Sequence, residues 1–200
     1  MNDKQYLNKM LEMKKNKMNR RKLDLCLSQD LLRFGKYKPS FKDLLLHNEC
    51  WYIWQYIRHM RYIEYHQGKS GLHKFAYLWH WYRFKQLQFK LHFAIYPNTI
   101  GPGFRIFHVG NYTHVGPNVK IGKNCTMVSG VVFGNKTEQE DNRPVVVGDN
   151  CYFGLDCKIL GPVRIGNNVA IGAGAVVTKD IPDNAVVGGI PARILKFKEC

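Results

Sequence analysis

Residues 147–176 read VGDNCY FGLDCK ILGPVR IGNNVA IGAGAV when the sequence is written in blocks of six. Each block opens with an aliphatic or aromatic residue, and glycine often follows that residue. A second run from residue 115 keeps the same rhythm and reads VGPNVK IGKNCT MVSGVV FGNKTE. Self-similarity at a short fixed period is typical of a solenoid, in which successive coils stack on one another.

A period of six fits neither a helix, which repeats every 3.6 residues, nor an ordinary strand, whose faces alternate every two. Each block therefore predicts a short strand followed by a turn, with three blocks closing one triangular coil. We expect the opening residue of each block to point into the prism: Val115, Ile121, Met127, Phe133, Val147, Phe153, Ile159, Ile165, Ile171 and Val177. The residue four places on is small and should pack beside it, which gives Cys125, Cys151 and Cys157 a place in the core.

The loop NKTEQEDNRP, residues 135–144, separates the two runs and breaks the period. Its polar and charged composition predicts a segment extruded from one coil, which costs little closure entropy. Such excursions on a rigid scaffold often shape a binding site, and a tolerated insertion is the other interpretation.

Residues 1–94 lack the period of six and predict a helical region, whereas residues 95–200 form the solenoid domain. Ser40 and Asp43 resemble a capping box that opens a helix. Gly68 and Gly71 then interrupt the pattern before a second, aromatic-rich helix over residues 72–91.

The solenoid is expected to begin near Pro97, and residues 1–22 are polar, basic and poorly periodic, so we expect them to fray. The simplest role for the helical pair is to cover the strand edges at the N-terminal end of the solenoid.

The net charge is +15, and residues 1–94 carry most of it, with 19 Lys and Arg against 7 Asp and Glu. This basic region fits nucleic acid, an anionic membrane surface or an acidic or lipid-linked glycan, and the charge does not choose among them. Aromatic residues interleaved with the cations are compatible with RNA stacking or membrane anchoring, but a helical pair packed on the solenoid is the favoured interpretation, and no recognition motif for nucleic acid accompanies them.

The six cysteines form no C-x-x-C pair, and no histidines have a zinc-like spacing, so we expect no metal site. The N-terminus lacks the apolar segment of a signal peptide. We expect a cytoplasmic protein with reduced thiols, which could also contact the inner face of the membrane.

Residues 100–198 resemble the catalytic domain of serine acetyltransferases and of related sugar or polysaccharide O-acetyltransferases. The most specific parts are the ending VVTKDIPDNAVVGGIPARI and the histidine-containing stretch RIFHVGNYTHVG. The resemblance implies a mainly β fold, a left-handed parallel β-helix preceded by helices. It also implies acetyl-CoA as the acetyl donor and a homotrimer with active sites between adjacent solenoids.

Acetyl transfer from a thioester to a hydroxyl needs a base, hydrogen-bond donors for the developing oxyanion and a groove that holds the acetyl donor. The resemblance places the base at His108, since an imidazole can accept a proton near neutral pH. His114 is a rival, but one block later it should project from another face of the coil. The positions that match family contacts to acetyl-CoA are Gly154, Ala173, Thr178, Lys179, Arg193 and Lys196.

Three positions depart from the serine acetyltransferase pattern. Phe107 replaces the aspartate before the catalytic histidine, and Ala94 lies near the place of the aspartate that partners it. Arg143 replaces a loop histidine. Without carboxylates for an ammonium group, the pattern favours a sugar hydroxyl in polysaccharide synthesis, with Arg143 as a contact to an acidic sugar. Serine O-acetylation is the alternative, and a noncatalytic hexapeptide-repeat binding module is the second alternative.

Overall fold

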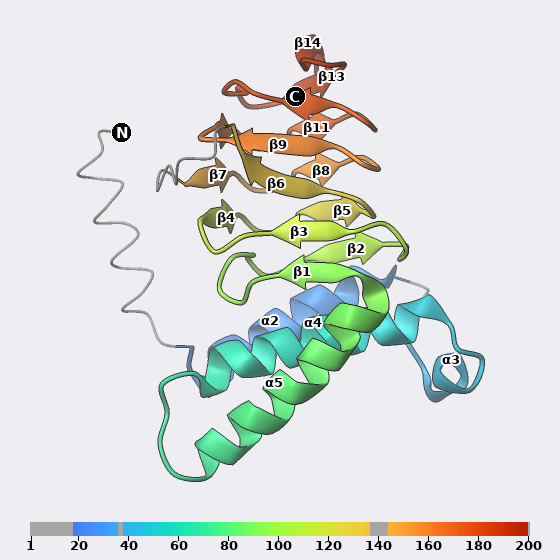
Figure 1. The fold of residues 1–200 in the computed structure, drawn as a ribbon, viewed down its shortest axis with the longest axis vertical. Helices are drawn as coiled ribbons and strands as arrows, with labels where there is room; N and C mark the ends of the chain where they lie inside the picture. The colour runs from blue at the N-terminus through green and yellow to red at the C-terminus, as the bar shows by residue number, and fades with distance from the viewer. Residues whose placement is uncertain (1–17, 36–37, 137–143, 200) are drawn as a thin grey trace.

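The computed structural model describes residues 18–35, 38–136 and 144–199. The helices gather at one end of the molecule, and the strands stack along its long axis toward the C-terminus (Figure 1). The described helices are α2 (Arg20–Leu32), α3 (Phe41–Leu45), α4 (Glu49–His66) and α5 (Leu72–Leu91). The chain leaves α5 at Leu91 and enters the first strand of the solenoid at Phe93.

The helix expected to open at Ser40 is two helices in the structure. The backbone N–H of Ser40 donates to Asp43 Oδ2 at 2.7 Å, so the expected capping contact forms, but α3 lasts only five residues. His47 then adopts a positive φ of 52°, and Asn48 caps a new helix by accepting from the N–H of Cys50 at 3.0 Å. The prediction of one continuous helix is therefore wrong, because it overlooked a second cap inside it.

The break between α4 and α5 lies at the two glycines where the sequence predicted it. Gly68 and Gly71 have φ values of 72° and 64°, which glycine adopts at little cost. The expected fraying of residues 1–22 falls mostly outside the described residues, but residues 20–22 form the first turn of α2. Leu23 and Cys26 on that helix are buried, so its inner face holds this segment in place.

Three parallel sheets form the faces of the solenoid. Their strand orders are β1-β3-β6-β9-β12, β10-β7-β4 and β14-β13-β11-β8-β5-β2, and the pairing is parallel except between β13 and β14. Each face therefore takes one strand from each successive coil, as the prediction of three blocks per coil requires. The strands are β1 (Phe93–Ile95), β2 (Arg105–Phe107), β3 (Thr113–Val115), β4 (Val119–Ile121), β5 (Thr126–Val128), β6 (Val132–Asn135), β7 (Val145–Val147), β8 (Tyr152–Phe153), β9 (Lys158–Gly161), β10 (Arg164–Ile165), β11 (Ala170–Ile171), β12 (Val176–Val177), β13 (Ala185–Gly188) and β14 (Arg193–Phe197).

The core of the solenoid consists of the residues that the period of six selected. All ten opening residues are buried, and so are the small residues that follow four places later, including Cys125, Cys151 and Cys157. Asparagine occupies the left-handed corner position in successive coils, with φ between 56° and 61° at Asn124, Asn150, Asn168 and Asn184. The burial confirms the predicted core, and asparagine suits these corners because it tolerates the left-handed conformation.

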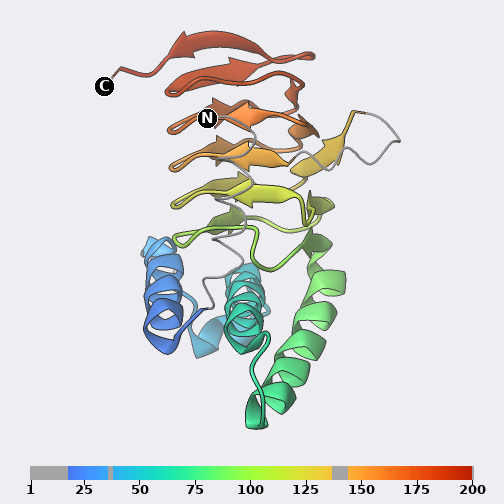
Figure 2. The same ribbon diagram turned by 90° about the vertical axis from the view of Figure 1, so that its left-hand side faces the viewer.

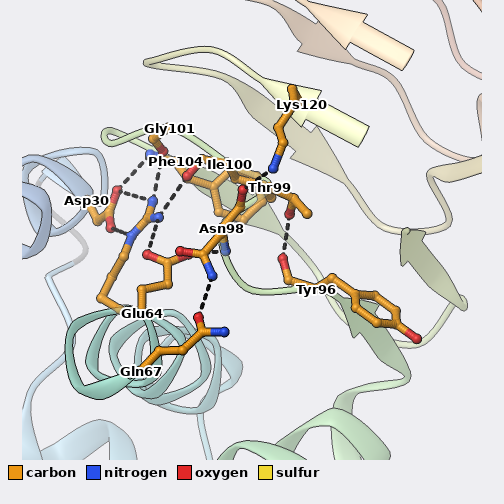
Figure 3. Close-up of polar contacts among 11 residues, drawn as sticks. Asp30, Glu64, Gln67, Tyr96, Asn98, Thr99, Ile100, Gly101, Phe104 and Lys120 are labelled. Atoms are coloured by element: carbon orange, nitrogen blue, oxygen red, sulfur yellow. Dashed lines mark hydrogen bonds and ion pairs between the residues drawn. The ribbon is translucent and has the colours of Figure 1, made fainter. Parts of the chain in front are cut away.

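A buried charged network joins the helices to the first coil (Figure 3). Arg61 on α4 is 1% exposed, and its Nε donates to Asp30 Oδ2 of α2 at 2.8 Å. Its two terminal nitrogens donate to the carbonyls of Ile100 and Gly101 at 2.8 and 2.7 Å. Burial alone would lower the pKa of Arg61, but the carboxylates of Glu64 and Asp30 outweigh burial and raise it. The guanidinium therefore stays charged and ties two helices to the backbone of the solenoid.

The same carboxylates also bind backbone on the solenoid side. Phe104 donates its N–H to Asp30 Oδ1 at 2.9 Å, and Asn98 donates its N–H to Glu64 Oε1 at 2.7 Å (Figure 3). Because each carboxylate is shared between Arg61 and a backbone amide, the network fixes the position of α4 on the first coil. That position matters for the site described next, which α4 and the solenoid share.

Candidate active site

His108 lies at a corner of the solenoid, directly after β2. Its φ of 61° is unusual for a residue with a side chain, and it turns the chain sharply away from the strand. The side chain is 69% exposed. The imidazole is thus available to a ligand at the surface of the first coil.

A carboxylate from the helical region binds this imidazole. His108 Nδ1 lies 2.9 Å from Glu49 Oε1, and a carboxylate can only accept, so Nδ1 carries the proton. The other oxygen of Glu49 accepts from the N–H of Val109 at 3.3 Å. This arrangement holds the ring in one orientation and leaves the lone pair of Nε2 free to accept a proton.

Glu49 is a candidate site residue that the sequence analysis did not identify. It is the first residue of α4, and Asn48 caps that helix. Because one helix was expected to run on from Ser40, Glu49 looked like an ordinary residue in a helix interior. The signal that could have found it is the pair Asn48-Glu49, since a capping residue followed by an acid marks a helix start.

Further hydrogen bonds hold the segment after His108. The carbonyl of Gly110 lies 3.0 Å from His92 Nδ1, and the N–H of Asn111 donates to Ser129 Oγ at 3.0 Å. The side-chain amide of Asn111 donates to both carboxylate oxygens of Asp156, at 3.1 and 3.0 Å. Residues from α5's end and from two later coils therefore support the loop that carries the imidazole.

Two of the residues expected to bind acetyl-CoA lie on the same corner of the solenoid as His108. Strands β2, β5, β8 and β11 are neighbours in one sheet, and their registers pair Ile106 with Met127, Met127 with Phe153, and Phe153 with Ile171. The residues just after these strands include His108, Gly154 and Ala173. They form one column along the corner, which we call the His108 corner.

Gly154 and Ala173 are in direct backbone contact within that column. A Cβ on Gly154 would lie 2.6 Å from the backbone nitrogen of Ala173, which no real Cβ tolerates. Glycine is therefore required at position 154 for two coils to stack. Ala173 is exposed, so a ligand could reach the backbone at this point of the column.

The other four residues expected to bind acetyl-CoA do not lie on the His108 corner. Thr178 and Lys179 follow β12, which belongs to the sheet of β1 and β3, so they lie at another corner. Arg193 and Lys196 are exposed on β14, at the end of the solenoid farthest from the helices (Figure 1). The structure does not bring these four residues next to His108 within one chain.

His114 lies on β3, in a different sheet from β2, which confirms that the two histidines face different sides. Burial lowers the pKa of His114, so its neutral form is favoured. Ala94 on β1 pairs with His114 and lines a cavity of about 590 Å³ at the end of α5. Arg143, the expected substrate contact, lies outside the described residues.

The fold and part of the sequence are similar to those of known acetyltransferases. A family model described as the hexapeptide repeat of succinyl-transferase matches residues 144–179. A serine acetyltransferase from Bacillus pumilus is 37% identical over 97 residues, which cover 48% of this chain and 44% of that protein. The chain thus spans less than half the length of that relative.

Solved structures extend the similarity to the helices. A crystal structure of Neisseria gonorrhoeae serine acetyltransferase superposes with a TM-score of 0.69 at 23% identity, covering 90% of this chain and 67% of that one. A serine acetyltransferase in complex with CoA gives a TM-score of 0.62 at 21% identity, covering 88% and 71%. The predicted left-handed β-helix with N-terminal helices is confirmed, and the solenoid of this chain is similar in sequence to that of serine acetyltransferases and contains a hexapeptide repeat.

Proposed function

We propose that this protein is an acetyl-CoA-dependent O-acetyltransferase in which His108 is the general base and Glu49 positions it. The observation that carries the proposal is the 2.9 Å contact between His108 Nδ1 and Glu49 Oε1. The same carboxylate also accepts from the N–H of Val109, but the packing of an exposed imidazole at a solenoid corner does not require a partner. A base needs one, because the partner fixes its tautomer and the direction of its free nitrogen.

The chemistry follows from that geometry. His108 Nε2 takes the proton of the acceptor hydroxyl as the oxygen attacks the carbonyl carbon of the thioester. The tetrahedral oxyanion collapses, the carbon–sulfur bond breaks, and the thiolate of CoA takes the proton from the imidazolium. Glu49 accepts a hydrogen bond from Nδ1 throughout and stabilises the imidazolium while it exists. No covalent acyl-enzyme forms.

The placement of the donor-binding residues fits a site shared between subunits. Gly154 and Ala173 lie on the His108 corner, whereas Thr178 and Lys179 lie at another corner of the same chain. In a homotrimer of parallel solenoids, different corners of adjacent chains face one another. Acetyl-CoA would then lie along the His108 corner, with its phosphates near the cations of β14 or of a neighbour.

For the acceptor, the similarity to serine acetyltransferases favours L-serine over the sugar hydroxyl that the sequence analysis put first. The sugar remains a second candidate for one reason. Phe107 and Ala94 supply no carboxylate for the ammonium of serine, and Glu49 already binds His108.

The test is release of free thiol from acetyl-CoA by the purified full chain. We expect turnover with L-serine, and a loss of about 10²–10⁴-fold in His108→Ala, the range that general acid–base catalysis provides. His73→Ala, at the far end of α5, is the matched control and should keep its activity. Full activity in His108→Ala would contradict the proposed base. Turnover with a glycan but not with serine would reject serine alone.

A further inference from the structure

One side of α5 is covered and the other is not. The buried residues of this helix are Phe84, Leu87 and Leu91, which face α4 and the first strand. Figure 2 shows α5 at the outer edge of the helical end, with no other described element beyond it. The outward side is therefore a free face in the part of the chain that the structure describes.

Large apolar side chains occupy this free face. Phe75 is 73% exposed, Leu78 61% and Phe89 88%, and Trp79 and Tyr82 are more than half exposed. At 100° per residue these five side chains fall on the side of the helix opposite Phe84 and Leu91. We call them the α5 outer face. A contiguous apolar patch of this kind usually marks an interaction site.

Cations flank the α5 outer face, and the helix has no acid at all. Lys74 and Lys85 lie on one flank and Arg83 and Lys90 on the other, and all four are exposed. The sequence of α5 contains no Asp or Glu in 20 residues. A neutral apolar partner would leave these cations without counterions, so the surface is complementary to a partner that is apolar and negatively charged.

We propose that the α5 outer face docks on an anionic lipid bilayer, with the helix lying in the plane of the interface. Tryptophan and tyrosine prefer the headgroup level, and lysines on the flanks reach the phosphates. A second copy of this chain is a poorer partner, since two such faces would bring like charges together. None of the described helices combines the length and the apolar content that crossing a bilayer requires. Exposed aromatic and apolar side chains flanked by cations are the features of a helix that lies on a membrane surface.

The test is co-sedimentation of the full chain with vesicles of phosphatidylcholine alone or mixed with phosphatidylglycerol. We expect the protein to sediment with the mixed vesicles and to remain in solution with the neutral ones. Lys74→Glu with Lys85→Glu should weaken binding by about fivefold for each lysine lost, and more because the charge is reversed. Raising the salt concentration should weaken it further, because the screening length shortens.

Two further variants test the location of the face. Phe75→Ser, Leu78→Ser and Phe89→Ser together should abolish sedimentation while leaving the circular dichroism and thermal unfolding of the protein unchanged. The matched control changes Ile190, Leu195 and Phe197 to serine, since these are also exposed but lie at the opposite end. The control should bind the mixed vesicles as the wild type does.

Three results would overturn the proposal. The first is equal sedimentation of the wild type and the α5 variants, and the second is loss of binding in the control instead. The third concerns the mass in solution, measured by light scattering after size exclusion. A smaller assembly in the triple serine variant would show that a second copy covers the α5 outer face.

Discussion

The solenoid and the helical end of this protein are stabilised in different ways. In the solenoid, every coil repeats the same contacts, and the same aliphatic, small and asparagine positions recur from residue 115 to residue 187. At the helical end, the main contacts are made by individual side chains that have no counterpart in a repeat, such as Arg61 in its buried network. A change at the helical end therefore has no neighbouring repeat to compensate for it.

Replacing Arg61 should have the largest effect on stability. Arg61→Met leaves the carboxylates of Asp30 and Glu64 buried without a cation, and breaking such a buried pair costs about 3–5 kcal/mol. We expect the helical end to detach or the protein to be recovered in aggregates. Arg58→Met, on the exposed side of the same helix, is the matched control and should change the free energy of unfolding little. Equal denaturant midpoints for the two variants would contradict the role given to the network.

A change at a coil contact should have a smaller effect. Gly154→Ala forces a Cβ to within 2.6 Å of the backbone of the next coil, and overpacking of this kind costs about 1–3 kcal/mol. Gly134→Ala is the control, because its Cβ would meet only Leu160 at 3.6 Å, an ordinary contact. Thermal unfolding of both variants measures the difference. If Gly154→Ala melts with the wild type, the coils are not packed as tightly as described.

Acid should loosen the helical end before the solenoid. Burial lowers the pKa of His59 and of His80 to about 4, and nearby Arg58 adds to the effect. The unfolded values lie near about 6.5, so the unfolded chain binds protons first as the pH falls. The stability that the neutral imidazoles of His59 and His80 contribute is fully present above about pH 6.5 and is lost as the pH falls from there to about 4.

Hydrogen exchange at a series of pH values can detect this loosening. Amides of α4 and α5 should exchange faster as the pH falls through this window, while those of β9 change little. His59→Gln with His80→Gln should flatten the dependence. A pH dependence that survives in the double variant would assign the effect to other groups.

The same contrast explains what could be predicted from the sequence. The period of six recurs in every coil, so the sequence alone identifies core residues such as Val147, Phe153 and Ile159. The capping signals of Asn48 were also present in the sequence, although the stronger pattern at Ser40 hid them. Arg61 carried no such signal, because in the sequence a buried arginine looks like any other cation on a helix.

The candidate site shows the same division. His108 was found through its place in a repeat that resembles a known family, whereas Glu49 comes from 59 positions earlier in a region with no repeat. The contact between them depends on how α4 lies on the first coil, and side chains such as Arg61 and Glu64 set that placement. No local pattern in the sequence encodes a contact made across two regions.

The most direct test of the account is a double-mutant cycle on thiol release by Glu49→Gln, His108→Ala and the double variant, with Asp24→Asn as a control carboxylate. We expect Glu49→Gln alone to lower kcat/KM by about 10²-fold, because the base loses its orientation. In the His108→Ala background the same change should have no further effect, since the two residues act as a unit. Multiplicative losses in the double variant would show that Glu49 does not act through His108 and would contradict the central claim.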